Sequence, residues 1–181
     1  MGVIHACAQL RALPIMLALL LATAACTTTE PAQNTLDPQR QELAFMAAKS
    51  LRAQGKRVWC VPFARNLSGI DIRGNARTWW AQAGDRFRQG HEPEVGAVMA
   101  FAPSGSMSLG HVAVVSSIVD DRQIRIDHAN WRPNEISLNM AVVDVSEDND
   151  WSAVRVESFK GSLGRVYPID GFIYPNYSTE Q

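Results

Sequence analysis

The sequence predicts an α+β domain in which N-terminal helices pack on an antiparallel sheet. Two helical segments come first, at residues 38–54 and 60–67, and strand-like runs separated by Gly, Pro, Asp and Asn fill the second half of the chain. With 181 residues, 46% of them apolar, the chain is long enough for one domain with a buried core. Its 17 basic and 18 acidic side chains, without a basic block, argue against nucleic-acid binding.

The first 25 residues have the pattern of a secretory signal peptide. Arg11 precedes an apolar run over residues 12–22, and small residues then lead to Cys26. The apolar run is too short for a membrane-spanning helix, which needs about 20 apolar residues. The small residues before Cys26 resemble a bacterial lipobox, whose cysteine is lipidated, although Thr23 stands where Leu is usual. The alternative is ordinary cleavage that leaves Cys26 as a spare thiol.

Residues 26–36 are rich in Thr, Pro, Gln and Asn and lack an apolar period, which is typical of a flexible tether. Thr27, rather than Asp, follows the cysteine and resembles lipoproteins sorted to an outer membrane. We therefore expect an exported, periplasmic protein with a lipid anchor and a folded domain over residues 37–181.

The folded domain is expected to begin with a helix. Asp37 is a suitable N-cap, Pro38 suits the first helical position, and Gly55 stands just past the end. The predicted buried stripe of this helix consists of Leu43, Met46, Ala47 and Leu51.

A second helix is predicted over residues 60–67, since Pro62 is tolerated only in a first turn, and a short third helix over 75–83. In the third helix, at least one of Trp79 and Trp80 should face the core. Strand-like runs follow at residues 96–101, 111–119, 123–130, 153–159 and 166–174.

Cys60 is the only cysteine within the predicted domain, so no internal disulfide can form there. It lies at a helix start, where unpaired N–H groups and the positive end of the helix dipole stabilise an anion, and Lys56 and Arg57 lie just upstream. We therefore predict a thiol that ionises readily and acts as a nucleophile. The alternative is a buried, inert cysteine.

Two histidines can serve as its base. His91 lies in a polar turn and is predicted to be on the surface, whereas His111 and His128 lie in strand-like runs. A tight hairpin centred on residues 120–121 would bring His111, His128 and Asn130 onto one face of the sheet. The same alternation would point Asp127 to the opposite face and make it a poor partner for His111.

These residues suggest a nucleophile, a base and an orienting group. Cys60 would attack a carbonyl, His111 would act as the base, and His128 or Asn130 would fix the imidazole tautomer. The backbone N–H of Cys60 is a candidate oxyanion donor. Cys60, His111 and His128 could instead bind catalytic zinc, but the sequence has no His-Glu-x-x-His or paired-Cys spacing, so we expect no metal.

Four blocks of the sequence resemble a CHAP domain (cysteine, histidine-dependent amidohydrolase/peptidase). They start at Trp59 (WCVPFAR), Gly74 (GNARTWW), Pro93 (PEVGAV) and Gly110 (GHVAVV), and the resemblance spans most of residues 50–175. It implies a papain-like fold, with Cys at a helix start and His on the facing sheet. It also implies cleavage of amide bonds in peptidoglycan without a cofactor.

The segment Asp127–Trp131 departs from this pattern. Many CHAP domains have Glu-x-Asn-Trp here, so that His128 takes the place of Glu while Asn130 and Trp131 match. Trp131 is the candidate for the substrate groove. The resemblance implies an N-acetylmuramoyl-L-alanine amidase or stem-peptide endopeptidase, and we expect a monomer; the alternative is a catalytically weak wall-binding lipoprotein that keeps the fold.

Overall fold

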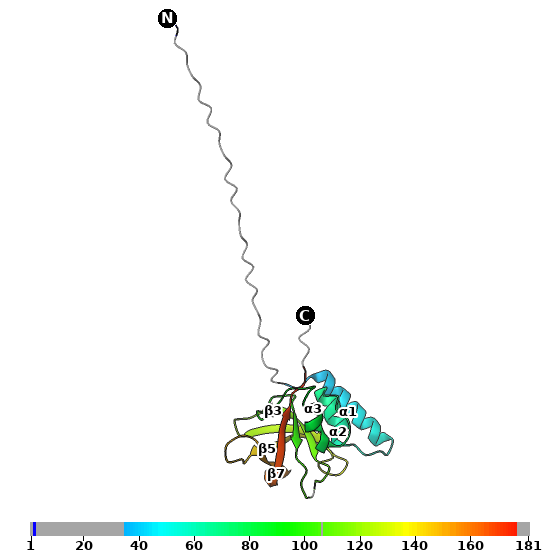
Figure 1. Cartoon of the computed structure of the whole chain (residues 1–181). Helices are drawn as coiled ribbons and strands as arrows, with labels where there is room; N and C mark the ends of the chain where they lie inside the picture. The colour runs from blue at the N-terminus through cyan, green and yellow to red at the C-terminus, as the bar shows by residue number, and fades with distance from the viewer. Residues whose placement is uncertain (1, 3–34, 106, 177–181) are drawn as a thin grey trace. The chain divides into compact units, whose positions relative to one another are not determined.

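An antiparallel sheet that closes on itself forms the body of the protein, and the helices cover one side of it (Figure 1). The computed structural model describes residues 2, 35–105 and 107–176. The helices are α1 (Pro38–Ala53), α2 (Cys60–Ser68), the 3-10 helix η1 (Ala76–Thr78) and α3 (Trp79–Ala83). The strands are β1 (Gln89–Gly90), β2 (Val98–Phe101), β3 (His111–Ile118), β4 (Gln123–Ala129), β5 (Ile136–Asp144), β6 (Ala153–Phe159) and β7 (Ser162–Ile173). The α+β class predicted from the sequence is confirmed.

The long strand β7 closes the sheet. The described strands follow the order β1-β7-β2-β3-β4-β5-β6, and β7 also pairs with β6. The first part of β7, residues 162–168, pairs with β6, and its last part, residues 169–173, pairs with β2. The sheet is therefore barrel-like and all its pairings are antiparallel.

The start and end of α1 agree with the prediction. The Asp37 side chain accepts hydrogen bonds from the N–H groups of Gln39 and Arg40, and Pro38 occupies the first turn. Gly55, just past the helix, has a φ of 67°, a conformation that glycine adopts at little cost.

The buried face of α1 agrees only in part with the predicted stripe, since Leu51 packs against the core and Ala47 is half-buried. Leu43 and Met46 are 53% and 57% exposed, and the residues that are buried are Ala44 and Ala48. Because α1 packs against α2, small side chains one turn apart let the two backbones approach closely. Phe45 completes this contact by packing edge-on against the ring of Phe63 in α2, at 5.9 Å between centroids.

The hairpin between β3 and β4 is not the tight turn that was predicted. Ile118 pairs with Ile124 next to the turn, which is one residue out of the predicted register. A bulge between Val115 and Ser117 then restores the predicted register, so that Val114 lies opposite Asp127. The bulge therefore returns His111 and His128 to the face expected from the sequence.

The structure contains elements that the sequence did not indicate. Strands β1 and β5 were not predicted, and β7 begins four residues earlier than expected. Leu36, at the end of the predicted tether, is 6% exposed and belongs to the core. The predicted signal peptide and Cys26 lie outside the described residues. Within residues 35–105 and 107–176, no helix has the length and apolar character needed to span a bilayer.

The two faces of the sheet carry separate cores. One lies inside the barrel-like sheet and includes Met99, Phe101 and Phe172. The other lies between the sheet and the helices and includes Phe63 and Trp79. Trp79 is fully buried, as expected for one of the two adjacent tryptophans.

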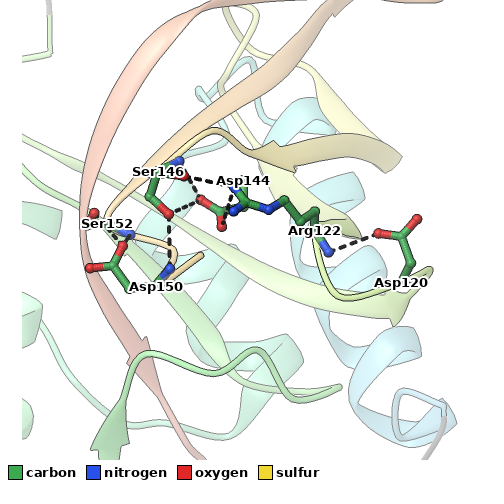
Figure 2. A network of polar contacts seen from close by, with 6 residues as sticks. All are labelled: Asp120, Arg122, Asp144, Ser146, Asp150 and Ser152. Carbon is green, nitrogen blue, oxygen red and sulfur yellow. Dashed lines mark hydrogen bonds and ion pairs between the residues drawn. The ribbon is translucent and has the colours of Figure 1, made fainter. Parts of the chain in front are cut away.

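A polar network ties the β3–β4 turn to the β5–β6 connection (Figure 2). The Arg122 guanidinium lies 3.5 Å from Asp144 Oδ2 and donates to the carbonyl of Ser146. Asp144 Oδ1 accepts hydrogen bonds from both the N–H and the hydroxyl of Ser146, and the hydroxyl in turn accepts from the N–H of Asp150. The Asp144 carboxylate is buried with a cationic partner, so removing that partner would leave a costly buried charge.

Candidate active site

The thiol of Cys60 stands at the first residue of α2. The preceding N-cap, Trp59, offers no side-chain hydrogen bond to the helix, so the first N–H groups of α2 remain available. The N–H groups of Val112, Val61 and Cys60 itself act on the sulfur and lower its pKa. Since Val112 directly follows His111 in β3, this contact sets the sulfur against the strand that carries the predicted base.

Burial nevertheless raises the pKa of the Cys60 thiol, because desolvation of the thiolate outweighs the three N–H groups. The prediction that this cysteine ionises more readily than usual is therefore wrong for the resting protein. The local pattern of a helix start was identified correctly. The desolvation arises from tertiary packing around the sulfur, which the local pattern does not describe.

Cys60 and His111 line one pocket of about 780 Å³. Its walls come from the start of α2, the loop before η1, the loop before β3 and the segment after β4, and Arg165 and Tyr167 of β7 also contribute. The pocket thus gathers segments that are far apart in sequence and offers space for a ligand above the thiol.

Behind His111, a chain of buried contacts runs into the barrel-like sheet. Nε2 of His111 lies 3.0 Å from Nδ1 of His128, and Nε2 of His128 lies 3.2 Å from the sulfur of Met140. His111 is 5% exposed, His128 is fully buried and Met140 is 7% exposed. Because Nε2 of His111 faces His128, its Nδ1 is the ring nitrogen left for the pocket side.

Burial lowers the pKa of His111 to about 3. The pKa of His128 is also well below its ordinary value, first because of burial and then because of the neighbouring His111. Both rings are therefore neutral near pH 7. With the raised pKa of Cys60, this indicates a neutral thiol and imidazole at rest rather than the ion pair expected from the sequence.

Trp131 joins the histidines to an aromatic cluster. Its ring stacks on His128 at 5.4 Å and meets His111 edge-on at 5.1 Å, both between ring centroids. Phe101 and Tyr167 also contact Trp131, at 5.6 and 5.1 Å between ring centroids. These rings hold both imidazoles in place, and Trp131 also lines the pocket, as expected for a groove residue.

Residues 52–130 match the family model of the CHAP domain. This confirms the resemblance drawn from the sequence over these residues, whereas residues 131–175, which the resemblance was also expected to cover, lie outside the match. The CHAP family comprises hydrolases and amidases related to peptidoglycan. The matched segment contains Cys60, His111, His128 and Asn130, whereas Trp131, Met140 and Arg165 lie beyond it. A search of curated proteins found no match.

Asn130 and Asp127, the other polar side chains considered in the CHAP segment, make contacts away from His111. Asn130 lines the pocket, but its Oδ1 accepts a hydrogen bond from the N–H of Asn134, and its φ of 62° marks it as part of a turn. Asp127 Oδ1 accepts from the N–H of Asn139 in β5. Of the two orienting groups left open by the sequence, His128 is the one in contact with His111.

Gly110 holds the backbone that leads into His111. It has a φ of 68°, and a Cβ at this position would lie 2.7 Å from the N and 2.9 Å from the Cα of Arg77. The Arg77 N–H donates to the carbonyl of Leu109, so a backbone hydrogen bond joins η1 to the loop before β3. A glycine is required here by both conformation and space.

Three residues escaped sequence reasoning: Arg165 and Tyr167, which line the pocket, and Met140, which contacts His128 behind it. Met140 lies in the strand that was not predicted, and Arg165 and Tyr167 lie in β7, which crosses the pocket only because the sheet closes. The Arg165 guanidinium lies 4.7 Å from the Tyr167 ring centroid. Among the described residues that line the pocket, two are arginines and none is acidic, so the pocket favours an anionic ligand.

No group of three or more His, Cys, Asp or Glu side chains in residues 35–105 and 107–176 is arranged to hold a metal ion.

Proposed function

We propose that this protein is a thiol hydrolase that cleaves an amide bond of peptidoglycan, either the bond between muramic acid and L-alanine or one within the stem peptide. The observation that carries the proposal is that Cys60 and His111 line one pocket and that His111 is backed by His128 at 3.0 Å. The match to the CHAP family supports the same substrate.

In the proposed reaction, His111 acts as a general base toward a neutral thiol. Nδ1 of His111 takes the Cys60 proton as the sulfur forms a bond to the amide carbon, and the resulting oxyanion is stabilised by backbone N–H groups at the start of α2. The C–N bond then breaks, and His111 gives its proton to the leaving amine. Water hydrolyses the thioester, with His111 accepting the water proton, and the thiol is regenerated.

The charge of the pocket supports an acidic peptide as substrate. Arg65 already has a carboxylate partner, since its Nε lies 3.8 Å from Asp71. Arg165 stacks on Tyr167 and has no ion pair within 4.0 Å among the described residues. A stem-peptide carboxylate next to the scissile bond would supply the partner for Arg165.

Digestion of purified sacculi tests the proposal. The full chain, Cys60→Ser and His111→Gln are compared, with His91→Gln as a control because His91 is an exposed histidine outside the pocket. We expect new amines and soluble fragments with the full chain and the control only, and the fragment masses identify the bond. Equal release by Cys60→Ser would refute the thiol mechanism.

A wall-binding protein with weak catalysis is the second candidate. The raised pKa of Cys60 favours it, because little thiolate is present at neutral pH. Binding of the full chain and Cys60→Ser to sacculi, without fragment release by either, would support this function. Iodoacetamide inactivation of hydrolysis would support the thiol enzyme instead.

We also propose that the protein is exported and anchored to the outer membrane through lipidated Cys26. The signal-like residues 1–25 and the lipobox-like residues before Cys26 support this location. Metabolic labelling with an alkyne fatty acid should mark the full chain and not Cys26→Ser. Labelling of both forms would refute the anchor at Cys26.

A further inference from the structure

The structure assigns a positioning role to Met140: its sulfur fixes the tautomer of His128 and, through it, that of His111. The catalytic consequence rests on the proposed function, whereas the tautomers themselves do not. The basis is the buried series of contacts from His111 through His128 to Met140, at 3.0 and 3.2 Å.

The argument starts from what a thioether can do. The sulfur of Met140 carries no hydrogen, so it can accept a hydrogen bond and cannot donate one. Nε2 of His128 faces this sulfur at 3.2 Å inside a fully buried environment. If Nε2 were unprotonated, two sets of lone pairs would face each other and the nitrogen would lose its partner. Nε2 of His128 therefore carries the proton.

The tautomer of His111 follows from that of His128. A neutral imidazole has one protonated nitrogen, so a proton on Nε2 leaves Nδ1 of His128 as an acceptor. This acceptor lies 3.0 Å from Nε2 of His111, which must then be the donor. Nδ1 of His111, the nitrogen on the pocket side, is thereby left unprotonated and able to take the Cys60 proton.

The opposite arrangement would place a donor where the reaction needs a base. With the proton of His128 on Nδ1, Nε2 of His111 would have to accept, and the proton of His111 would sit on Nδ1. His111 could then not take a proton from Cys60 on that side. His128 therefore offers His111 an acceptor only while Met140 keeps His128 in the required tautomer.

The fold itself explains why Met140 reaches His128. The pairing of β4 with β5 shifts between Ile126 and His128, and Met140 pairs with Ile126 just before the shift. The Met140 side chain belongs to the core of the barrel-like sheet and contacts His128 there. Met140 does not line the pocket, so its influence on the reaction passes through His128.

Long-range proton–nitrogen correlation spectra of the full chain, labelled with ¹⁵N-histidine, test the inference at pH 7. Such spectra distinguish protonated from unprotonated ring nitrogens. We expect protonated Nε2 in both His128 and His111. A protonated Nδ1 in His128 would overturn the inference, whether or not the protein cleaves peptidoglycan.

Variants then test the role of the sulfur. Met140→Leu keeps the volume and removes the acceptor, and Met99→Leu makes the same change at a buried methionine of the same core that has no hydrogen bond to either histidine. For Met140→Leu we expect mixed tautomers of His128 and a fall in kcat of about twofold to fivefold, the loss of one weak hydrogen bond, with KM unchanged. Met99→Leu should leave both quantities unchanged.

A second variant separates the loss of an acceptor from the loss of a polar partner. The amide of Met140→Gln has similar reach and can either accept or donate a hydrogen bond, so both tautomers of His128 would find a partner and we expect mixed tautomers, as in Met140→Leu. Retention of the single tautomer by both variants would overturn the inference, because the sulfur would then not select it. Correct tautomers in a chain that does not hydrolyse sacculi would refute the proposed function alone.

Discussion

Lowering the pH from 7 to 5 is expected to destabilise the fold through His111 and His128. Burial lowers the pKa of His111 from 6.5 to about 3, and that of His128 is also well below 6.5. In the unfolded chain both rings take up protons near pH 6.5, whereas in the folded chain they stay neutral. The unfolded state therefore binds more protons, and stability falls as the pH drops from about 6.5 toward 3.

The magnitude follows from the pKa values. At pH 5, protonation of a histidine of pKa 6.5 stabilises the unfolded chain by about 2 kcal/mol, a gain that a folded ring of pKa about 3 does not share. His128, whose pKa is lowered in the same direction, adds to this cost. The loss from His111 alone is already a substantial part of the stability of a typical domain, about 5–15 kcal/mol.

Urea unfolding at pH 7, 6 and 5 measures this loss. His128→Gln should lose part of the pH dependence, even if its stability at pH 7 is lower. His91→Gln should keep all of it, because His91 is exposed. Carboxylates titrate alike in all three proteins, so they do not affect the comparison. A His128→Gln protein with the full dependence of the unmodified chain would refute the assignment to buried histidines.

Three further predictions concern the pocket. The pH profile of kcat/KM should be a broad plateau, which falls on the acid side toward the lowered pKa of His111 near 3 and on the basic side above the raised pKa of Cys60. A fall of kcat/KM on the acid side near pH 6.5 would contradict a neutral thiol and imidazole at rest. Arg165→Gln should raise KM for an acidic stem peptide about threefold to tenfold and leave KM for the amidated form of that peptide unchanged. Equal changes of KM for both peptides would exclude a contact between Arg165 and the substrate carboxylate. Gly110→Ala should lower the free energy of unfolding by about 1–3 kcal/mol, because the added Cβ would collide with the Arg77 backbone. Gly105→Ala is the control, since nothing lies within 4 Å of a Cβ there. Equal melting temperatures of the two variants would contradict the collision at Gly110.

The residues best predicted from sequence are those whose signals are local. Asp37, Pro38 and Gly55 mark the limits of α1 through capping chemistry alone, and α2 begins at Cys60 as its pattern indicated. The common sheet face of His111 and His128 was also expected, but from a tight turn that the structure does not have. The turn shifts the β3–β4 pairing by one residue and the bulge in β3 shifts it back, and nothing in the sequence marks that bulge.

What failed depended on packing between distant segments. Hydrophobicity selected Leu43 and Met46 for the buried face of α1, but close contact with α2 requires the small Ala44 and Ala48. The reactivity of Cys60 was judged from the helix start, whereas desolvation decides its pKa.

Strand β5 was missed for a related reason. Its alternation is interrupted at Asn139, which has a φ of 52°, and Leu138 on the same strand is 47% exposed. Without β5, no sequence pattern could bring Met140 to His128.

The closure of the sheet by β7 has a consequence for the order of biosynthesis. Cys60, His111 and His128 all leave the ribosome before residues 162–173, the last described strand, which alone joins β2 to β6. The partners Phe101 and Ile169 are separated by more than sixty residues, and such distant pairings form slowly. A nascent chain would thus carry these side chains for some time in a half-open sheet, and the pocket would be completed only when β7, with Arg165 and Tyr167, has been added.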